Sequence, residues 1–248
     1  MSRIDSQEQF YKEKKVSQKV AIVTASGKGI GAAVARTLAE AGYRVSLMSK
    51  SGGAAALAGE LGGIGMTGSV TDPDDLEKLV ETTMEKYGRI DAVVNNTGHP
   101  PKGDILAISD DDWRIGLELL ILNVVRMARL VTPIFEKQGG GAMVNISTFS
   151  AFEPDPAFPV SSSLRGGLAG FTKLYADRYA QKGIRMNNVL PGFMDNYPES
   201  PEIIAKIPMK RYAKVEEVAK TVRFLLSEEA GYITGQNIRV DGGINHSV

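Results

Sequence analysis

Short apolar runs alternate along the chain with longer segments in which apolar residues recur every three or four positions. The short runs are rich in β-branched residues and predict strands over residues 20–24, 44–48, 64–67, 91–95, 142–147, 185–190 and 237–240. The longer segments predict helices over residues 29–41, 74–87, 111–137, 161–182 and 215–226. Strands that alternate with helices are typical of a parallel sheet with helices on both faces. The pattern therefore predicts an α/β, doubly wound fold.

The length of 248 residues, without an internal repeat or a low-complexity linker, is typical of one α/β domain. We expect a polar N-terminal extension over residues 1–19 and a single domain over residues 20–248. The extension lacks the apolar core of a signal peptide, and no apolar run approaches the roughly 20 residues of a membrane span. The sequence therefore predicts a cytoplasmic protein with no membrane partner.

The charge balance and the absence of cysteine exclude several kinds of partner and site. The 29 Lys and Arg residues balance the 29 Asp and Glu residues, so no overall field would hold the chain on a phosphate backbone. We therefore expect no nucleic-acid partner. The chain has no cysteine, which excludes disulfides, thiolate metal sites and a cysteine nucleophile.

A glycine-rich turn over residues 24–31 follows the first predicted strand and leads into the first predicted helix. Glycines here let the backbone approach a pyrophosphate, and the helix N-terminus offers free N–H groups and a favourable dipole. The turn predicts a dinucleotide site with contacts from Ser26, Lys28, Ile30 and Gly31. A tight turn without a ligand is the alternative.

The end of the second predicted strand bears on the choice of cofactor. An acidic residue there would bind the ribose 2′-hydroxyl of NAD, whereas a hydroxyl beside a cation suits a 2′-phosphate. This strand runs into Ser49 and Lys50, which together with Lys28 favour NADP(H) over NAD(H). Solvated surface lysines are the alternative.

The fourth predicted strand ends in Asn95, Asn96, Thr97 and Gly98. Asparagine amides can satisfy strand-end backbone groups beside a cofactor, and glycine permits close approach. Alone, this segment fits any turn. In combination with the glycine-rich turn, we expect Asn95, Asn96 and Gly98 to contact the same nucleotide.

The predicted helix around residues 113–131 carries apolar residues on nearly every side, which is typical of a buried helix. Burial on the far side of an outer helix requires a partner subunit, and Gly166, Gly167 and Gly170 would let the next helix pack closely on a neighbour. We therefore expect a homodimer or homotetramer, with an intramolecular core as the alternative. Trp113 is expected in the core.

These motifs together resemble those of the short-chain dehydrogenase/reductase family over nearly the whole chain after the extension. The resemblance rests on the segments at residues 24–31, 95–98, 170–173 (Gly-Phe-Thr-Lys), 191–193 (Pro-Gly-Phe), 232–235 (Tyr-Ile-Thr-Gly) and 240–243 (Val-Asp-Gly-Gly). It implies a single Rossmann domain with a seven-stranded parallel sheet, a dimer or tetramer, and cofactor contacts from Pro191 and Gly192. It further implies hydride transfer between NAD(P)H and a small carbonyl or alcohol substrate.

The family carries a catalytic Asn, Ser, Tyr and Lys, and the resemblance assigns these positions to Leu120, Thr148, Ser161 and Arg165. Thr148 keeps a hydroxyl that can bind a substrate oxygen, and Arg165 keeps a charge that can hold the nicotinamide ribose. Ser161 lacks the phenol that a nearby cation tunes for acid/base work. Leu120 lacks an amide that orders water, and Asn123 one turn later is a partial substitute. The candidate catalytic residues are Thr148, Ser161 and Arg165, and Arg165 also contacts the cofactor.

The proton of such a site must then come from another group. The candidates are His99, Tyr197 and Asp155, which lie in loops that would face the cleft. The alternative for each of them is a loop side chain in solvent. For the serine run that begins at Ser161, the alternative is a helix N-cap. The first functional hypothesis is an NADP(H)-dependent oxidoreductase with an atypical proton relay. The alternative is a catalytically silent family member that binds NADP(H) or serves as a partner subunit.

Overall fold

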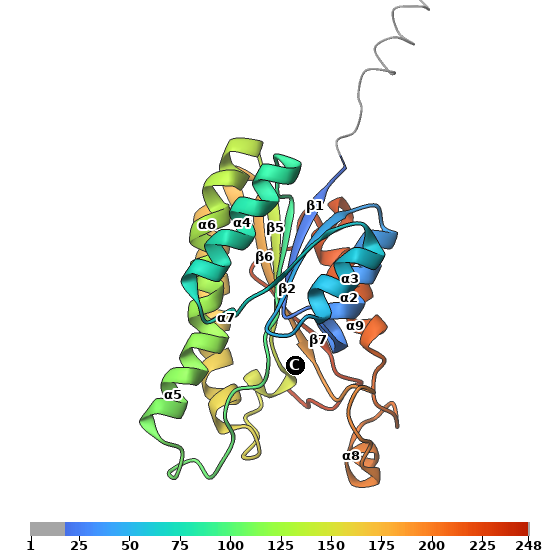
Figure 1. The fold of residues 1–248 in the computed structure, drawn as a ribbon. Helices are drawn as coiled ribbons and strands as arrows, with labels where there is room; N and C mark the ends of the chain where they lie inside the picture. The colour runs from blue at the N-terminus through green and yellow to red at the C-terminus, as the bar shows by residue number, and fades with distance from the viewer. Residues whose placement is uncertain (1–17, 248) are drawn as a thin grey trace, which may run out of the picture.

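Seven parallel strands form one sheet in the order β3-β2-β1-β4-β5-β6-β7 in the computed structural model, which describes residues 18–247 (Figure 1). Their bounds are β1 (Val20–Thr24), β2 (Arg44–Ser49), β3 (Ile64–Thr67), β4 (Ala92–Asn95), β5 (Gly141–Ile146), β6 (Ile184–Pro191) and β7 (Asn237–Val240). The predicted α/β fold is confirmed, and every strand end lies within one residue of its predicted position. The predicted extension over residues 1–19 falls almost wholly outside the described residues.

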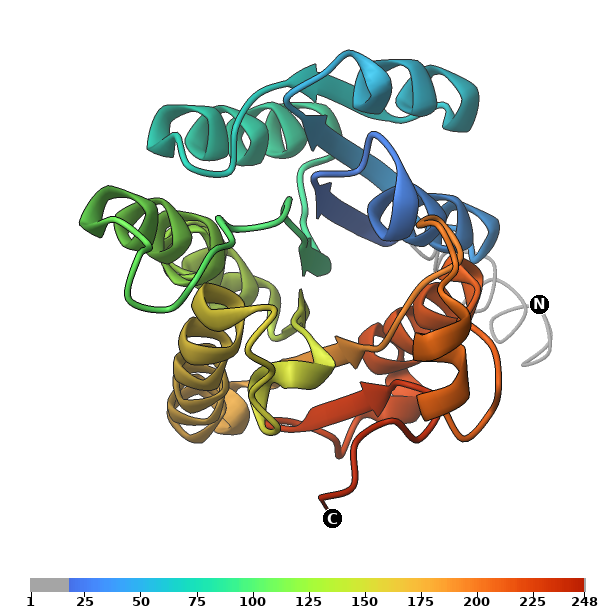
Figure 2. The same cartoon turned by 90° about the horizontal axis from the view of Figure 1, so that it is seen from below.

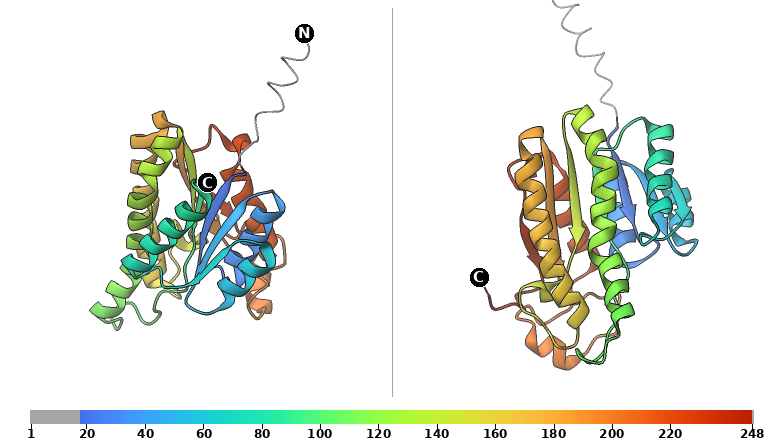
Figure 3. Two further views of the ribbon diagram at one scale, coloured as in Figure 1. Left: turned by 45° about the horizontal axis from the view of Figure 1, so that its top comes forward. Right: turned by 90° about the vertical axis from the view of Figure 1, so that its left-hand side faces the viewer.

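Helices cover both faces of the sheet (Figures 1 and 3). They are α2 (Gly29–Glu40), α3 (Gly53–Leu61), α4 (Pro73–Tyr87), α5 (Asp110–Leu117), α6 (Asn123–Gln138), α7 (Pro159–Tyr179), α8 (Pro201–Lys206) and α9 (Val215–Leu226). One apolar core lies between the sheet and α2, α3 and α9, and a second lies between the sheet and α4, α6 and α7. Of the helices described within residues 18–247, none is both long and apolar enough to cross a membrane.

Three local features differ from the predicted elements. The predicted helix over residues 111–137 is divided, because a π-helical turn over Glu118–Leu122 joins α5 to α6. The sequence does not predict α3, whose glycines weaken the helical pattern, or α8, which is only six residues long. Helix α7 begins at Pro159 with Phe158 as its N-cap, so the serine run lies inside the helix and the N-cap interpretation of Ser161 is wrong.

A row of asparagines crosses the sheet at positions that are paired in register. Asn95 Nδ2 donates to Asn145 Oδ1 at 2.8 Å, Asn145 Nδ2 to Asn188 Oδ1 at 2.9 Å, and Asn188 Nδ2 to Asn237 Oδ1 at 2.8 Å. Thr172 of α7 joins this asparagine ladder, since its Oγ1 accepts from Asn145 and donates to Asn188. Asn145 and Asn188 are fully buried, where an unpaired amide is costly. The ladder therefore fixes both the strand register and the position of α7.

The apolar region around residues 113–131 is buried only in part within one chain. Leu120 lies in the core, but Trp113 is half-buried and Leu117 is 37% exposed. On α7, Leu174 is 71% exposed, and a Cβ added at Gly170 would meet nothing within 4 Å. The core placement of Trp113 and the alternative of a purely intramolecular core are therefore wrong for the single chain. The homo-oligomer stays a prediction.

Candidate active site

The segments that the sequence assigns to nucleotide binding and catalysis lie together where the strands end, at the carboxyl edge of the sheet. Figure 2 looks onto this edge, which is surrounded by the blue turn after β1, the green loop after β4, the yellow segment after β5 and the orange segment after β6. Open parallel sheets bind ligands at this edge, where the strand order reverses. The reversal here falls between β1 and β4.

The glycine-rich turn brings the N-terminus of α2 to the carboxyl edge. Ala25 and Gly29 take the left-handed conformation, with φ of 46° and 56°, and a Cβ at Gly31 would lie 2.5 Å from the Ala25 carbonyl oxygen. Lys28 is the N-cap residue of α2, and its side chain makes no cap hydrogen bond. The N–H groups of the first turn, including that of Ile30, are therefore left for a ligand. This donor set fits the pyrophosphate of a dinucleotide.

The side chain of Ser26 holds the turn in place instead of facing a ligand. Ser26 is fully buried, and both its N–H and its hydroxyl donate to the Met48 carbonyl oxygen, at 3.0 and 3.4 Å. These bonds tie the glycine-rich turn to the end of β2. The Ser26 side chain therefore has a structural role, and the predicted contact of Ser26 with the cofactor stays a prediction.

Ser49 and Lys50 lie at the end of β2, and Lys28 lies in the glycine-rich turn after β1. The Ser49 hydroxyl donates to the Ser51 carbonyl at 2.7 Å and accepts from Ala54 N at 3.0 Å, so Ser49 anchors the start of α3. Its predicted contact with a 2′-phosphate is not supported. Lys28 and Lys50 are exposed, and neither makes an ion pair within residues 18–247. Their ammonium groups are the charges available to a 2′-phosphate.

Asn96 joins the loop after β4 to the glycine-rich turn. Its Nδ2 donates to the Ala25 carbonyl oxygen at 3.1 Å, and its N–H donates to Thr24 Oγ1 at 2.9 Å. The Asn96 amide thus satisfies a backbone group of the turn, as the sequence leads us to expect. It holds the two loops at the spacing that a shared ligand requires.

The residues next to Asn96 differ in their surroundings: Asn95 lies in the sheet, and Thr97 and Gly98 lie in the loop after β4. The Asn95 side chain lies in the asparagine ladder, and its predicted contact with the cofactor stays a prediction. Thr97 Oγ1 is buried without a partner, and a Cβ at Gly98 would meet nothing within 4 Å. An unpaired buried hydroxyl beside open space fits a site that a ligand completes.

The predicted catalytic residues are carried by α7 and by the segment after β5. Ser161, Arg165 and Thr172 are spaced by four and seven residues, so they share the face of α7 that packs on the sheet. Ser161 is half-buried in the first turn of α7. Thr148 is the N-cap of the 3₁₀ turn Phe149–Ala151, which packs against α7. The structure therefore gathers Thr148, Ser161 and Arg165 at the carboxyl edge.

Arg165 is a buried cation with an unused donor. Its Nη1 donates to the Ile146 carbonyl oxygen at the end of β5, and its Nε is buried without a partner. Burial lowers the pKa of Arg165 to about 10, so the guanidinium stays charged at neutral pH. It supplies a fixed positive charge and a free N–H to a ribose or an anionic group.

The position assigned to the family asparagine has no polar group. Leu120 is buried in the core. Asn123, its expected substitute, is buried directly after the π-helical turn, and its Oδ1 has no partner among the described residues. Buried amide oxygens of this kind are satisfied by ordered water, which keeps Asn123 as a candidate for the role.

Two of the three candidate proton donors meet at the carboxyl edge. His99 Nε2 and the Tyr197 hydroxyl are 2.6 Å apart, and their ring centroids are 5.5 Å apart. Burial lowers the pKa of His99, and the charges of Lys102 and Arg165 lower it further. Asp155 differs, because its Oδ1 accepts from the backbone N–H two residues later, in a local turn.

The segment after β6 completes the site. Pro191 is buried, and a Cβ at Gly192 would lie 2.8 Å from Asp241 Cα, so the chain leaves the sheet directly against the end of β7. A Cβ at Gly29 would lie 3.1 Å from Asn196 Nδ2. Asn196 therefore lies over the glycine-rich turn, a placement that its loop position does not signal in the sequence.

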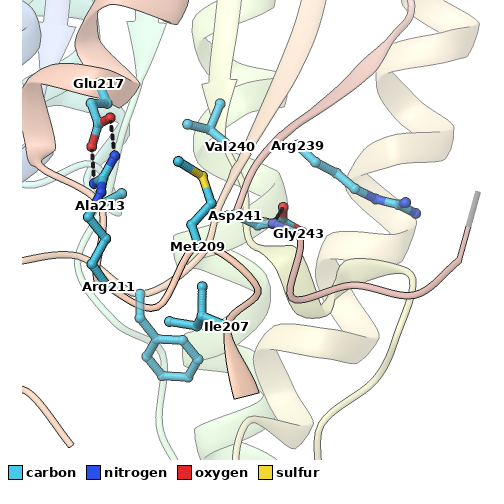
Figure 4. A pocket seen from close by; sticks show the side chains of 11 residues that line it. Ile207, Met209, Arg211, Ala213, Glu217, Arg239, Val240, Asp241 and Gly243 are labelled. Carbon is cyan, nitrogen blue, oxygen red and sulfur yellow. Dashed lines mark hydrogen bonds and ion pairs between the residues drawn. The ribbon is translucent and has the colours of Figure 1, made fainter. Parts of the chain in front are cut away.

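A cavity of about 470 Å³ lies beside this segment, between it and the end of β7 (Figure 4). Phe193, Ile207 and Met209 form its apolar wall, and Arg211 pairs with Glu217 at 2.7 Å on its polar wall. None of the predicted cofactor-binding residues lines it. The cavity is therefore distinct from the candidate nucleotide site.

Known proteins match the chain over nearly its whole length. The family model described as enoyl-(acyl carrier protein) reductase matches residues 24–245. The 3-oxoacyl-(acyl-carrier-protein) reductase of Synechocystis is 35% identical over 242 residues, which cover 92% of this chain and 98% of the relative. Human dehydrogenase/reductase SDR family member 4 is 35% identical over 247 residues, which cover 92% and 88%.

A solved structure matches the fold equally well. The crystal structure of L-sorbose reductase from Gluconobacter frateurii, complexed with NADPH and L-sorbose, has a TM-score of 0.86 at 29% identity and covers 94% of this chain and 98% of the other. The structural match agrees with the observed sheet and its helices. The chain belongs to the short-chain dehydrogenase/reductase family of oxidoreductases.

Proposed function

We propose that this protein is an NADP(H)-dependent oxidoreductase that transfers hydride between nicotinamide and a small carbonyl or alcohol. The observation that carries the proposal is the uncapped N-terminus of α2, flanked by Lys28 and Lys50 with no carboxylate at the end of β2. The NADPH in the L-sorbose reductase structure supports the choice of cofactor.

The groups left unpaired at the carboxyl edge fit such a cofactor. The first N–H groups of α2 would hold the pyrophosphate, and the two lysines would hold the 2′-phosphate. Thr97 Oγ1 and Arg165 Nε, both buried without partners, would bind the nicotinamide half. When bound, NADPH supplies a hydride, and the protein orients it against the substrate carbonyl.

The proton relay of this enzyme is atypical. Ser161 and Arg165 stand where the resemblance places a tyrosine and a lysine, and Leu120 stands where it places an asparagine. An aliphatic hydroxyl is a far weaker acid than a phenol, and a guanidinium does not exchange its proton near neutral pH. Thr148 keeps the capacity to bind the substrate oxygen, which leaves the proton donor to be supplied by another group.

The names of the relatives guide the choice of substrate. A 3-oxoacyl group and L-sorbose are both carbonyl compounds. A panel of 3-oxoacyl thioesters, ketoses and diketones therefore tests the proposal through the loss of NADPH absorbance. We expect NADPH to bind more tightly than NADH and to be oxidised with at least one of these classes. Binding of NADPH without any oxidation would support the catalytically silent alternative, which the named reductases among the relatives do not favour.

The assembly and location of the enzyme stay predictions. The exposed apolar side chains of α5 and α7, including Leu117 and Leu174, support a homodimer or homotetramer.

A further inference from the structure

The position from which the family donates its proton holds a residue that cannot do so here. Ser161 is half-buried in the first turn of α7, and its side chain makes no hydrogen bond within the described part of the chain. Reduction of a carbonyl still requires one proton for each hydride. We propose that the Tyr197 hydroxyl, held by His99, supplies that proton to the substrate oxygen. This proposal rests on the proposed function and assigns two residues to it.

The geometry of the pair carries the inference. His99 follows β4 and Tyr197 follows β6, so 98 residues separate them in the chain, yet Nε2 and the phenolic oxygen lie 2.6 Å apart. The two rings meet edge to face at 65°, which holds the phenol in a defined direction. Tyr197 is 49% exposed, so a substrate can reach its side chain. This phenol is held at the carboxyl edge by a second titratable group.

The charges around His99 set its protonation state. The groups that act on it are Lys102 on its own loop, Arg165 on α7 and Tyr197 on the loop after β6. Burial and the two cations lower the pKa of His99 below the ordinary imidazole value, so the ring is neutral at neutral pH. A neutral imidazole can donate from one nitrogen and accept at the other.

The proton transfer balances with this arrangement. The hydride adds to the carbonyl carbon as the electron pair of the C=O π bond moves to the oxygen. That oxygen takes the proton of the Tyr197 hydroxyl. As the phenolate takes the Nε2 proton of His99, Nδ1 of the ring takes one proton from solvent in the same step, so the ring stays neutral; exchange with solvent then returns the ring proton from Nδ1 to Nε2. The net change is one hydride and one solvent proton added to the carbonyl.

Two substitutions with matched controls test the pair. Tyr197→Phe removes the acid, and His99→Gln removes its partner. Tyr232→Phe removes a fully exposed phenol at the opposite edge of the sheet, before β7, and His246→Gln removes the other of the two histidines. Thermal melts and the dissociation constant of NADPH, measured on every variant, separate a lost proton donor from a lost fold or a lost cofactor site.

We expect Tyr197→Phe to lower kcat for carbonyl reduction at least about 100-fold and to change the NADPH dissociation constant by less than about twofold, since Tyr197 is not assigned to the cofactor. His99→Gln should lower kcat by less, and the double variant should be close to Tyr197→Phe alone, because the two residues act as one unit. In the Tyr197→Phe background, Ser161→Tyr with Arg165→Lys should recover at least about tenfold. The two controls should keep the wild-type rate.

Two readouts distinguish a relay from a merely structural contact. In the oxidation direction neutral His99 is the base, so the rate should fall as the pH falls through its lowered pKa, and His99→Gln should lose this limb. In ¹⁵N NMR spectra of the His246→Gln background, which leaves His99 as the single imidazole, the Nε2 shift should move with Tyr197→Phe and not with Tyr232→Phe.

The outcomes distinguish a failure of the proton relay from a failure of the proposed function on which the relay rests. A wild type that neither binds NADPH nor oxidises it with any carbonyl overturns the proposed function and the relay together. A wild type that is active, with Tyr197→Phe retaining its kcat within about threefold, overturns the relay alone. If the ¹⁵N chemical shift of His99 Nε2 is the same with and without Tyr197→Phe, the two side chains do not share a proton, and this result too overturns the relay.

Discussion

Removal of the Lys50 ammonium should weaken the binding of NADPH and leave the binding of NADH unchanged. Lys50 follows β2, is exposed, and makes no ion pair in the described part of the chain. NADH has no 2′-phosphate, so a lysine that binds that group distinguishes the two cofactors. Lys28 in the glycine-rich turn should act in the same way.

The magnitude follows from the exposure of the lysine. Two unit charges about 4 Å apart in water attract each other by about 1 kcal/mol, and a phosphate monoester carries nearly two charges, which gives about 2 kcal/mol. Side-chain ordering and salt reduce this value for an exposed group such as Lys50. We therefore expect Lys50→Ala to raise the dissociation constant of NADPH about 5- to 30-fold.

Calorimetric titration with both cofactors, at low and high salt, measures the effect. Lys137→Ala is the matched control, because Lys137 is an exposed lysine in the last turn of α6, at the opposite edge of the sheet. The loss caused by Lys50→Ala should shrink as salt rises, whereas the control should show no loss at either salt concentration. Equal affinity of the wild type for NADPH and NADH would refute the reasoning. So would unchanged NADPH binding in both Lys50→Ala and Lys28→Ala.

Three further predictions concern stability and assembly. Asn145→Ala leaves the buried Asn95 Nδ2 without its partner and removes the bonds from Asn145 to Asn188 and Thr172, while Asn188 keeps its bonds to Thr172 and Asn237. A loss of about 1 to 3 kcal/mol should lower Tm by roughly 3 to 10 °C, and an unchanged Tm would show that the ladder is not needed. Hydrogen bonds from Ser247 lower the pKa of Glu153 to about 2, so the stability they add is present above about pH 4.3 and is lost as the pH falls toward about 2; acid melts of Glu153→Gln should lack this loss. Light scattering should find a homodimer or homotetramer that Leu174→Asp shifts toward monomer, and a wild-type monomer at micromolar concentration would show that the exposed face of α7 has no partner.

The sheet and most helices could be predicted because each follows from a local pattern. The strand at Val20–Thr24 is a short buried apolar run, and the helix at Val215–Leu226 has an apolar face, so neither depends on distant residues. The position of the nucleotide site also follows, because the glycine-rich turn must lie at the end of β1. These features need only the order of residues along the chain.

The remaining features depend on residues that the fold brings together. The ladder from Asn95 to Asn237 exists only because four strands pair in one register, and no property of a single strand reveals that register. The same holds for His99 and Tyr197, each of which is an ordinary loop residue in the sequence. Ser49 differs, because its position in the sequence predicts a contact with a phosphate, whereas in the fold its hydroxyl donates to the Ser51 carbonyl oxygen.

The contacts that position α7 are separate from the proposed proton relay. Thr172 joins α7 to the asparagine ladder and Arg165 joins it to the end of β5, so the helix is positioned without any contribution from Ser161. A proton donor made by His99 and Tyr197 is instead held by one hydrogen bond between two loops. Its position depends on both loops at once, whereas the proposed nucleotide site is formed by α2 and the turn before it. Changes in the loop after β6 should therefore alter turnover more than cofactor affinity, and changes at Arg165 should alter both.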